Sequence, residues 1–261
     1  MKIAVFQMSA APDPATNLAR IETAMQEAAT NGARLLIAPE LATTGYGRGP
    51  VLTSLAQQGD GEWVTRLAAS AGRIGISLIA GFPEADGDAR YISALVINSE
   101  APDAPVIYRK TCLYGDYERS IFQSNGPSTV IVDLHGIKVG VLICYDVEFP
   151  ENVRRLARDG ADLVAVPTAL PHAESSRFVA QHVLRVRGFE NQIFMAYADQ
   201  ADGFEKFRFQ GLSSITAPDG AVLASAPESG DALIYALIDP AAYAASREES
   251  PYLRDLGTVV P

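Results

Sequence analysis

Short apolar segments that alternate with amphipathic helical patterns constrain the fold of this chain more than any other feature. The first half begins with an extended segment at residues 2–9, followed by a helix that we expect to start at Asp13, with Pro14 at its first position, and to end at Gly32. A second helix is expected near 62–72, and further strands at 34–38, 74–81, 91–98 and 106–109. This order of strands and helices indicates an α/β fold.

The second half repeats the alternation and adds hairpins. The turn sequences His135-Gly136 and Pro218-Asp219-Gly220 each separate two short strands. Helices are expected at 150–159 and 174–191, and strands at 130–134, 138–143, 162–167, 193–199, 211–217, 221–225 and 232–238. Hairpins place neighbouring strands antiparallel, whereas a doubly wound parallel sheet uses helical crossovers. We therefore predict two mixed β-sheets stacked face to face with helices outside, a four-layer αββα sandwich, rather than one parallel sheet.

Charge and segment lengths limit the partners of the protein. The 261 residues carry a net charge of −10 and contain no basic run longer than a pair, which argues against nucleic-acid binding. No apolar stretch approaches the ~20 residues of a membrane-spanning helix, and the first residues lack the apolar core of a secretory signal. We expect a cytoplasmic protein with one domain over 1–261, in which residues 241–261 form a tail on the surface or against a neighbouring subunit.

Several catalytic motifs are absent from the sequence. It contains no GxSxG, Walker-type glycine loop, HExxH or CxxC motif. The three histidines, His135, His172 and His182, are not spaced to bring their side chains together on one helix face. Two cysteines are too few for a disulfide framework or a four-ligand zinc site. We therefore expect neither a metal nor a cofactor.

Cys144 follows the apolar sequence VGVLI and precedes YDVEFPE, which leads into the helix predicted at 150–159. Reactive groups in open α/β folds lie at such corners, and a nearby helix N-terminus lowers the pKa of a thiol. Free cysteine is also among the most frequently buried residue types, so position alone leaves a nucleophile and a structural thiol equally open. Cys112, in the less patterned stretch 111–128, is expected to be structural.

Glu40 and Lys110 occupy strand ends similar to that of Cys144. A cysteine nucleophile needs a proton acceptor, and Glu40, at the end of RLLIAPE, would have a raised pKa if partly buried. Lys110, at the end of VIYRK, could stabilise a thiolate or an oxyanion. Each charge alone is better explained as a solvated strand end. Three complementary groups at three strand ends together favour a catalytic site.

Three sequence blocks resemble those of the carbon-nitrogen hydrolase (nitrilase) superfamily, and the resemblance covers nearly the whole chain. The blocks are LLIAPELATTGYG, YRKTCLYGDYERSIF and VGVLICYDVEFPENVRRLARDGADLVAVPTA, in the order and spacing of the family. The resemblance implies a nitrilase-like αββα sandwich whose subunits pair into an αββα:αββα dimer or a higher homo-oligomer. It also implies that Glu40 is the general base, Lys110 the oxyanion-stabilising cation and Cys144 the nucleophile.

The same resemblance extends to further positions. Glu118 matches a second glutamate that positions substrate and lysine, and the backbone amide of Tyr145 would be another oxyanion donor. Residues expected to line the substrate pocket are Tyr46, Tyr145, Thr168 and Ala169. A structural role is implied for Arg187, Glu190 and Asn191, and an interface position for the segment 250–256.

Within the superfamily, CYDVEFPE and PTAL are most similar to short aliphatic amidases such as 5-aminopentanamidase. This resemblance implies hydrolysis of a small linear carboxamide, aliphatic or amino-substituted, to a carboxylate and ammonia through a cysteine thioester. An N-carbamoyl amine amidohydrolase is the alternative, with Glu174 as a candidate carboxylate for an amine-bearing substrate. A nitrilase is less favoured because Tyr145 replaces the usual tryptophan. The three complementary groups argue against a non-catalytic binding subunit.

Overall fold

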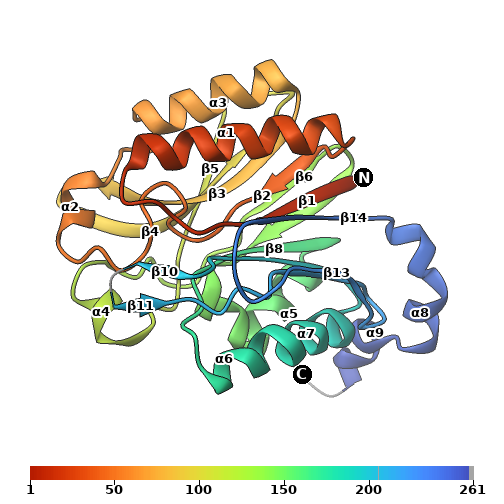
Figure 1. Cartoon of the computed structure of the whole chain (residues 1–261). Coiled ribbons are helices and arrows are strands. Elements are labelled where there is room, and N and C mark those ends of the chain that lie inside the picture. Colours follow the sequence, from red (N-terminus) through yellow and green to blue (C-terminus); the bar gives the residue numbers. More distant parts are fainter. Residues whose placement is uncertain (205, 259–261) are drawn as a thin grey trace.

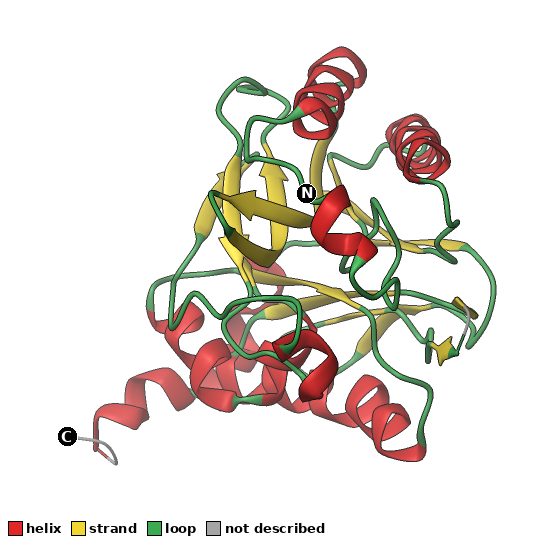
Figure 2. Cartoon of the chain, turned by 90° about the vertical axis from the view of Figure 1, so that its left-hand side faces the viewer, coloured by secondary structure: helices red, strands yellow, loops and turns green. Residues whose placement is uncertain are grey.

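Two mixed six-stranded β-sheets are stacked in the middle of the molecule, with helices on both outer sides (Figures 1 and 2). The strand orders are β14-β1-β2-β3-β4-β5 and β13-β12-β9-β8-β7-β6. This computed structural model describes residues 1–204 and 206–258. The predicted four-layer αββα sandwich is confirmed.

The first sheet combines parallel and antiparallel pairing. Strand β2 pairs in parallel with β1 and β3, whereas β4 and β5 continue the sheet antiparallel and β14 pairs antiparallel with β1. Its outer face is covered by α1 (Pro14–Thr30) and α3 (Glu62–Ile74). The strands are β1 (Lys2–Gln7), β2 (Leu35–Ile37), β3 (Ser77–Asp86), β4 (Ala89–Ile97), β5 (Val106–Arg109) and β14 (Ala232–Leu237).

The second sheet has the same number of strands and is covered by the helices of the second half. Strand β8 pairs in parallel with β7 and β9, and the outer pairs are antiparallel. The strands are β6 (Ile131–Leu134), β7 (Ile137–Val141), β8 (Leu163–Thr168), β9 (Phe194–Asp199), β12 (Ser214–Thr216) and β13 (Val222–Ser225). The covering helices are α5 (Pro150–Arg158), α6 (Glu174–Phe178) and α7 (Leu184–Asn191).

Alternation along the strands divides the core of the first sheet between its two faces. Ile3 and Val5 of β1 belong to the core cluster that includes the second sheet, whereas Ala4 and Phe6 pack with α1 and α3. Successive side chains of a strand point to opposite faces, so one short apolar segment supplies both layers. All four side chains are at most 6% exposed.

The start and end of the first helix and the first hairpin turn lie where the sequence predicted them. The side chain of Asp13 accepts hydrogen bonds from the amides of Ala15 and Thr16 at the start of α1, and Gly32 follows its end with φ +80°. His135 and Gly136 have positive φ in the hairpin between β6 and β7.

Several boundaries and small elements differ from the sequence expectations. The helix expected at 174–191 is divided by a π-helical turn at Val179–Val183, and α3 extends two residues beyond its expected end, so β3 begins later. Short elements that were not predicted are α2 (Val51–Leu55), α4 (Gly115–Arg119), β10 (Gly203–Phe204), β11 (Phe207–Arg208), α8 (Ala244–Glu249) and α9 (Tyr252–Asp255). Such elements are too short to show a hydrophobic period.

The tail expected at 241–261 packs against the second helical layer as far as it is described. The ring of Tyr243 lies 5.2 Å from that of Phe194, and the ring of Tyr252 lies 5.6 Å from that of Phe189. Ser246 Oγ donates to Gln192 Oε1 at 2.9 Å. Residues 259–261 lie outside the described part. None of the helices in the described ranges has the length and apolar character needed to cross a membrane.

Candidate active site

Cys144 lies at a sharp turn between β7 and the short 3₁₀ helix Cys144–Glu148. Its φ of +46° is in the left-handed region, which non-glycine residues seldom occupy and which is concentrated at functional sites. The residue is 6% exposed, so its thiol is almost entirely enclosed. The strand-end position predicted for Cys144 is therefore a strained corner.

Glu40 follows β2 on a segment that lies directly against β3. The amide of Gly81 donates to the Pro39 carbonyl at 3.0 Å, and its carbonyl accepts from the Thr43 amide at 3.3 Å. A Cβ at Gly81 would come within 2.6 Å of the Glu40 Cα and of the Pro39 oxygen. Gly81 thus permits an approach that no larger residue allows.

The second sheet also holds the backbone of Glu40. Its amide donates to the Thr168 carbonyl at 3.3 Å, and its carbonyl accepts from Gln200 Nε2 at 2.7 Å. Thr168 ends β8 and Gln200 follows β9. Both sheets therefore fix the position of this glutamate.

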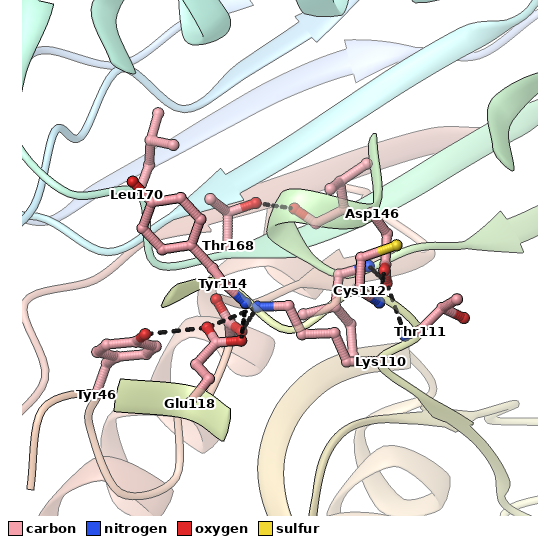
Figure 3. A network of polar contacts seen from close by, with 12 residues as sticks. Tyr46, Lys110, Thr111, Cys112, Tyr114, Glu118, Asp146, Thr168 and Leu170 are labelled. Carbon is pink, nitrogen blue, oxygen red and sulfur yellow. Dashed lines mark hydrogen bonds and ion pairs between the residues drawn. The ribbon is translucent and has the colours of Figure 1, made fainter. Parts of the chain in front are cut away.

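Lys110 connects two buried glutamates. Its Nζ donates to Glu40 Oε1 at 2.7 Å and to Glu118 Oε1 at 2.8 Å, and the three side chains are at most 1% exposed (Figure 3). The backbone of Lys110 is fixed in turn, because its amide donates to the Ile92 carbonyl at 2.8 Å. Distant segments of the sequence thus meet at one ammonium group.

Glu118, on α4, receives hydrogen bonds at both carboxylate oxygens. Besides Lys110, Tyr46 donates to Oε1 at 3.0 Å, and the Tyr114 amide donates to Oε2 at 2.7 Å (Figure 3). Charge-assisted hydrogen bonds of this kind are strong and fix geometry. Glu118 is thereby held as a fixed partner of Lys110.

Burial and mutual charges set the protonation of the group. Burial raises the pKa of Glu40 to about 7, with Lys110 opposing the rise and Glu118 adding to it. Burial disfavours charged Lys110, but the charges of Glu40 and Glu118 outweigh this and hold its pKa well above the usual range. Burial, followed by the charge of Glu40, raises the pKa of the Cys144 thiol well above its usual range. The thiol is therefore neutral and requires a base.

Glu40 has the chemical properties of a proton acceptor. Its Oε2 is buried and accepts no hydrogen bond from the residues that the structure describes. The side chain of Cys144 lowers the pKa of Glu40. A carboxyl with a pKa of about 7 exchanges protons readily near neutral pH. The arrangement can therefore deprotonate a thiol beside a fixed cation.

Asp146 is a buried residue that sequence reasoning did not single out. Its Oδ1 accepts from the Cys112 amide at 2.7 Å, and its Oδ2 accepts from the Ile143 amide at 3.1 Å and the Tyr108 hydroxyl at 2.9 Å. These bonds tie the segment after Lys110 to the turn that carries Cys144 (Figure 3). An aspartate in the first turn of a helix after a reactive corner was the available signal.

A small cavity opens beside Cys144. Its volume is about 70 Å³, and its lining includes the expected Tyr46, Tyr145 and Ala169, together with Glu118 and Cys144. Thr168, which was expected to line the pocket, is absent from that lining. Its side chain is fully buried, and its carbonyl accepts a hydrogen bond from the Glu40 amide. The lining also includes residues that were not expected, among them Tyr114, Glu148 and Val179.

Arg187 supports the turn behind the cavity, as its expected structural role implied. Its guanidinium donates to the carbonyls of Val147 at 3.0 Å and Glu148 at 2.6 Å, and to Glu190 Oε1 at 3.2 Å. Asn191 Nδ2 donates to the Arg187 carbonyl at 2.9 Å.

The remaining candidates do not join the cavity lining. The Glu174 side chain is 94% exposed, beside Arg177 on α6. Cys112 is half-buried, and burial raises the pKa of its thiol. His135 lies between Ser77 and Glu100 near the β6–β7 turn. In the ranges 1–204 and 206–258, no group of three or more His, Cys, Asp or Glu residues could hold a metal ion.

Comparisons with known proteins agree on one family. A family model described as carbon-nitrogen hydrolase matches residues 2–248. The "Hydrolase in pqqF 5'region" of Pseudomonas protegens is 39% identical over 98% of this chain and 88% of that protein. The omega-amidase NIT2 of Danio rerio is 31% identical over 96% of this chain and 92% of that protein.

A solved structure gives the same result. An amidase from Nesterenkonia sp. AN1 is 32% identical, with a TM-score of 0.87 over 98% of this chain and 96% of that chain. Structures of that amidase include one with acrylamide added to its active-site cysteine and one of a mutant in complex with butyramide. Of the three relatives described here, the two whose names state an activity are amidases.

Proposed function

Because this chain belongs to the carbon-nitrogen hydrolase family and is a hydrolase that acts on amides, we propose that its substrate is a small linear carboxamide, aliphatic or amino-substituted. The products are a carboxylate and ammonia. One observation carries the proposal. The Lys110 ammonium is held between Glu40 and Glu118, in the same site as the buried Cys144 with its strained backbone.

In the first half of the reaction, Glu40 removes the proton from Cys144 and the sulfur attacks the amide carbon. Negative charge develops on the amide oxygen, where the Lys110 ammonium and the Tyr145 backbone amide stabilise it. Glu40 returns the proton to the leaving nitrogen, so that ammonia departs and a thioester forms on Cys144.

In the second half, Glu40 accepts a proton from water, and the resulting hydroxide attacks the thioester carbon. The C–S bond breaks, the proton returns to sulfur, and the carboxylic acid is released and ionises. The net reaction consumes one amide and one water and yields one carboxylate and one ammonium ion. Glu118 fixes Lys110 throughout, because its carboxylate accepts hydrogen bonds from Lys110, Tyr46 and the Tyr114 amide.

The cavity supports a small substrate. A volume of about 70 Å³ holds only a few water-sized groups, since a single water needs about 10–15 Å³ of such space. Tyr114 and Tyr145 form one aromatic part of the lining, with ring centroids 5.2 Å apart. These rings favour a slim, unbranched acyl group.

We also propose that two copies of the chain pair through the outer face of α6 and α7. Phe178, Val186 and Phe189 are 59%, 50% and 38% exposed there. Tyr252 of the tail packs beside Phe189 and enlarges the same apolar area. Light scattering after size exclusion should report a dimer for the wild type and a smaller species for Val186→Asp. A monomeric wild type would overturn this pairing.

Ammonia release by the wild type and Cys144→Ala tests the proposed reaction. The panel contains small aliphatic amides, ω-amino amides, N-carbamoyl amines and nitriles. Release from amides by the wild type but not by Cys144→Ala supports the proposal. Cysteine-dependent release only from N-carbamoyl amines or nitriles would assign the enzyme to those substrates instead. Cys112→Ser is the matched control and should retain activity, since serine keeps the backbone amide through which Cys112 bonds Asp146.

A further inference from the structure

Glu148 places a carboxylate-bearing side chain at the cavity beside Cys144. It is the last residue of the 3₁₀ helix Cys144–Glu148, it is half-buried, and it belongs to the cavity lining. The negative charge of Glu148 contributes to the raised pKa of Tyr197 in β9. The positive charge of Lys110 in turn lowers the pKa of Glu148. The carboxylate is therefore electrostatically coupled to the interior of the site.

The carboxylate of Glu148 has no direct cationic partner among residues 1–204 and 206–258. Arg187 has a larger electrostatic effect on Glu148 than Lys110 has, but its hydrogen bonds go to the backbone carbonyls of Val147 and Glu148 and to Glu190. Burial raises the pKa of Glu148 above its usual range, although the charges of Arg187 and Lys110 oppose the rise. Partial burial of an unpaired carboxylate is unfavourable, and a bound cation would offset that cost.

The other carboxylates near the cavity are already engaged. Glu40 and Glu118 share the Lys110 ammonium, and Glu118 also receives Tyr46. When Glu40, Glu118 and Lys110 are all ionised, their net charge is −1. An ionised Glu148 makes the net charge −2. Such a site attracts a cationic substituent on the substrate and repels an anionic one.

We propose that Glu148 is a specificity-determining residue that binds an ammonium group on the acyl chain of the substrate. This inference rests on the proposed amide hydrolysis and narrows its substrate class to ω-amino carboxamides. Amides that carry a carboxylate at the far end are disfavoured by the same charge. The assignment replaces Glu174, whose side chain is 94% exposed on α6.

Pairs of substrates in which a methyl group replaces the ammonium group test this proposal. The pairs are glycinamide and propanamide, β-alaninamide and butanamide, 4-aminobutanamide and pentanamide, and 5-aminopentanamide and hexanamide. For the pair whose length fits the cavity, kcat/KM of the wild type should favour the amino amide by about 10- to 100-fold, the range of a charge-assisted hydrogen bond. In Glu148→Gln this ratio should fall to near one.

Glu174→Gln is the matched control because it removes a carboxylate from the exposed surface of α6. It should keep the wild-type ratio. Loss of the ratio in Glu174→Gln but not in Glu148→Gln would assign recognition to the outer glutamate and overturn the proposal. A ratio that is equal in the wild type and Glu148→Gln would overturn it as well.

The wild type alone keeps the proposal testable if Glu148→Gln does not fold. Wild-type protein should hydrolyse succinamate and glutaramate more slowly than the uncharged amides, because Glu148 repels their carboxylates. No preference among amino, methyl and carboxylate forms would overturn the role of Glu148 while amide hydrolysis stands. Hydrolysis of none of these amides would instead contradict the proposed substrate class.

Discussion

Lys110 Nζ lies 2.7 Å from Glu40 Oε1, and both side chains are fully buried. The pair joins a carboxylate with a pKa of about 7 to an ammonium that remains charged. The base and the positive charge that the proposed reaction needs are therefore in contact before substrate binds. This arrangement limits how far either group can be changed alone.

Substitution of Glu40 by glutamine should stop turnover and leave the fold intact. Glutamine has nearly the same shape but cannot accept the thiol proton, and loss of a general base costs roughly 10²- to 10⁴-fold in rate. Ammonia release measures the effect, and far-UV circular dichroism with thermal melting checks the fold. Activity of Glu40→Gln within tenfold of the wild type would remove Glu40 from the role of base.

The pH dependence of kcat/KM should show an acid limb with an apparent pKa of about 7, the value to which burial raises Glu40. The carboxylate form is the base, so activity should fall as the pH drops through that value. Initial rates with an uncharged amide measure this limb without titration of the substrate. A flat profile between about pH 5 and pH 8 would contradict the assignment.

The same ionisation should appear in folding stability with a defined sign. Folding raises the pKa of Glu40 from 4.5 to about 7, so between these values the native state binds more protons than the unfolded state. Its contribution to the free energy of unfolding therefore falls as pH rises through this interval. The free energy of unfolding, measured with urea across this interval, should change with pH at a different slope in the wild type than in Glu40→Gln. Identical slopes would show that the pKa of Glu40 is not raised.

Replacement of Lys110 by methionine should destabilise the fold as well as abolish activity. Methionine leaves the two carboxylates of Glu40 and Glu118 buried without their shared cation, and removal of one partner from a buried pair costs about 3–5 kcal/mol. Urea unfolding measures the loss, and Glu118→Gln in the same chain should recover part of it. The exposed Lys138→Met is the control. A Lys110→Met loss no larger than that of Lys138→Met would mean that the carboxylates are protonated.

Alanine at Gly81 should displace the segment that carries Glu40. The added Cβ would lie within 2.6 Å of the Glu40 Cα, and backbone at that distance must move. We expect a loss of about 1–3 kcal/mol in the free energy of unfolding and a larger relative loss in kcat/KM. Gly257→Ala is the control because its Cβ would meet no atom within 4 Å. Wild-type kcat/KM in Gly81→Ala would show that the contact is not required.

The sequence predicted the layers and the three groups at strand ends because both depend on short-range patterns. Apolar alternation identified the strands, and Glu40, Lys110 and Cys144 stand directly after such segments. Glu118 could be identified only by resemblance, since five-residue α4 carries no clear periodicity. Local pattern finds groups at the ends of regular elements, whereas groups on short elements require spatial information.

Residues that shape the cavity show the same limit. Glu148 is on a short 3₁₀ helix, and Val179 is where a π-helical turn interrupts the helix expected at 174–191. The hydrophobic period of a sequence does not distinguish an α-helical turn from a π-helical turn. The sequence therefore could not predict that either side chain lines the cavity. Glu174 was a candidate by charge alone, and its exposure depends on how α6 packs.

Strand β14 has a consequence for the order in which the protein assembles during synthesis. It pairs with β1 over six residues, from Lys2 with Leu237 to Gln7 with Ala232, although almost the whole chain separates them. Until residues 232–237 leave the ribosome, one edge of β1 has no partner, and an open apolar edge invites pairing with other chains. Translation that stops before β14 should therefore produce nascent chains that depend on chaperones, even though every proposed catalytic residue has already been synthesised.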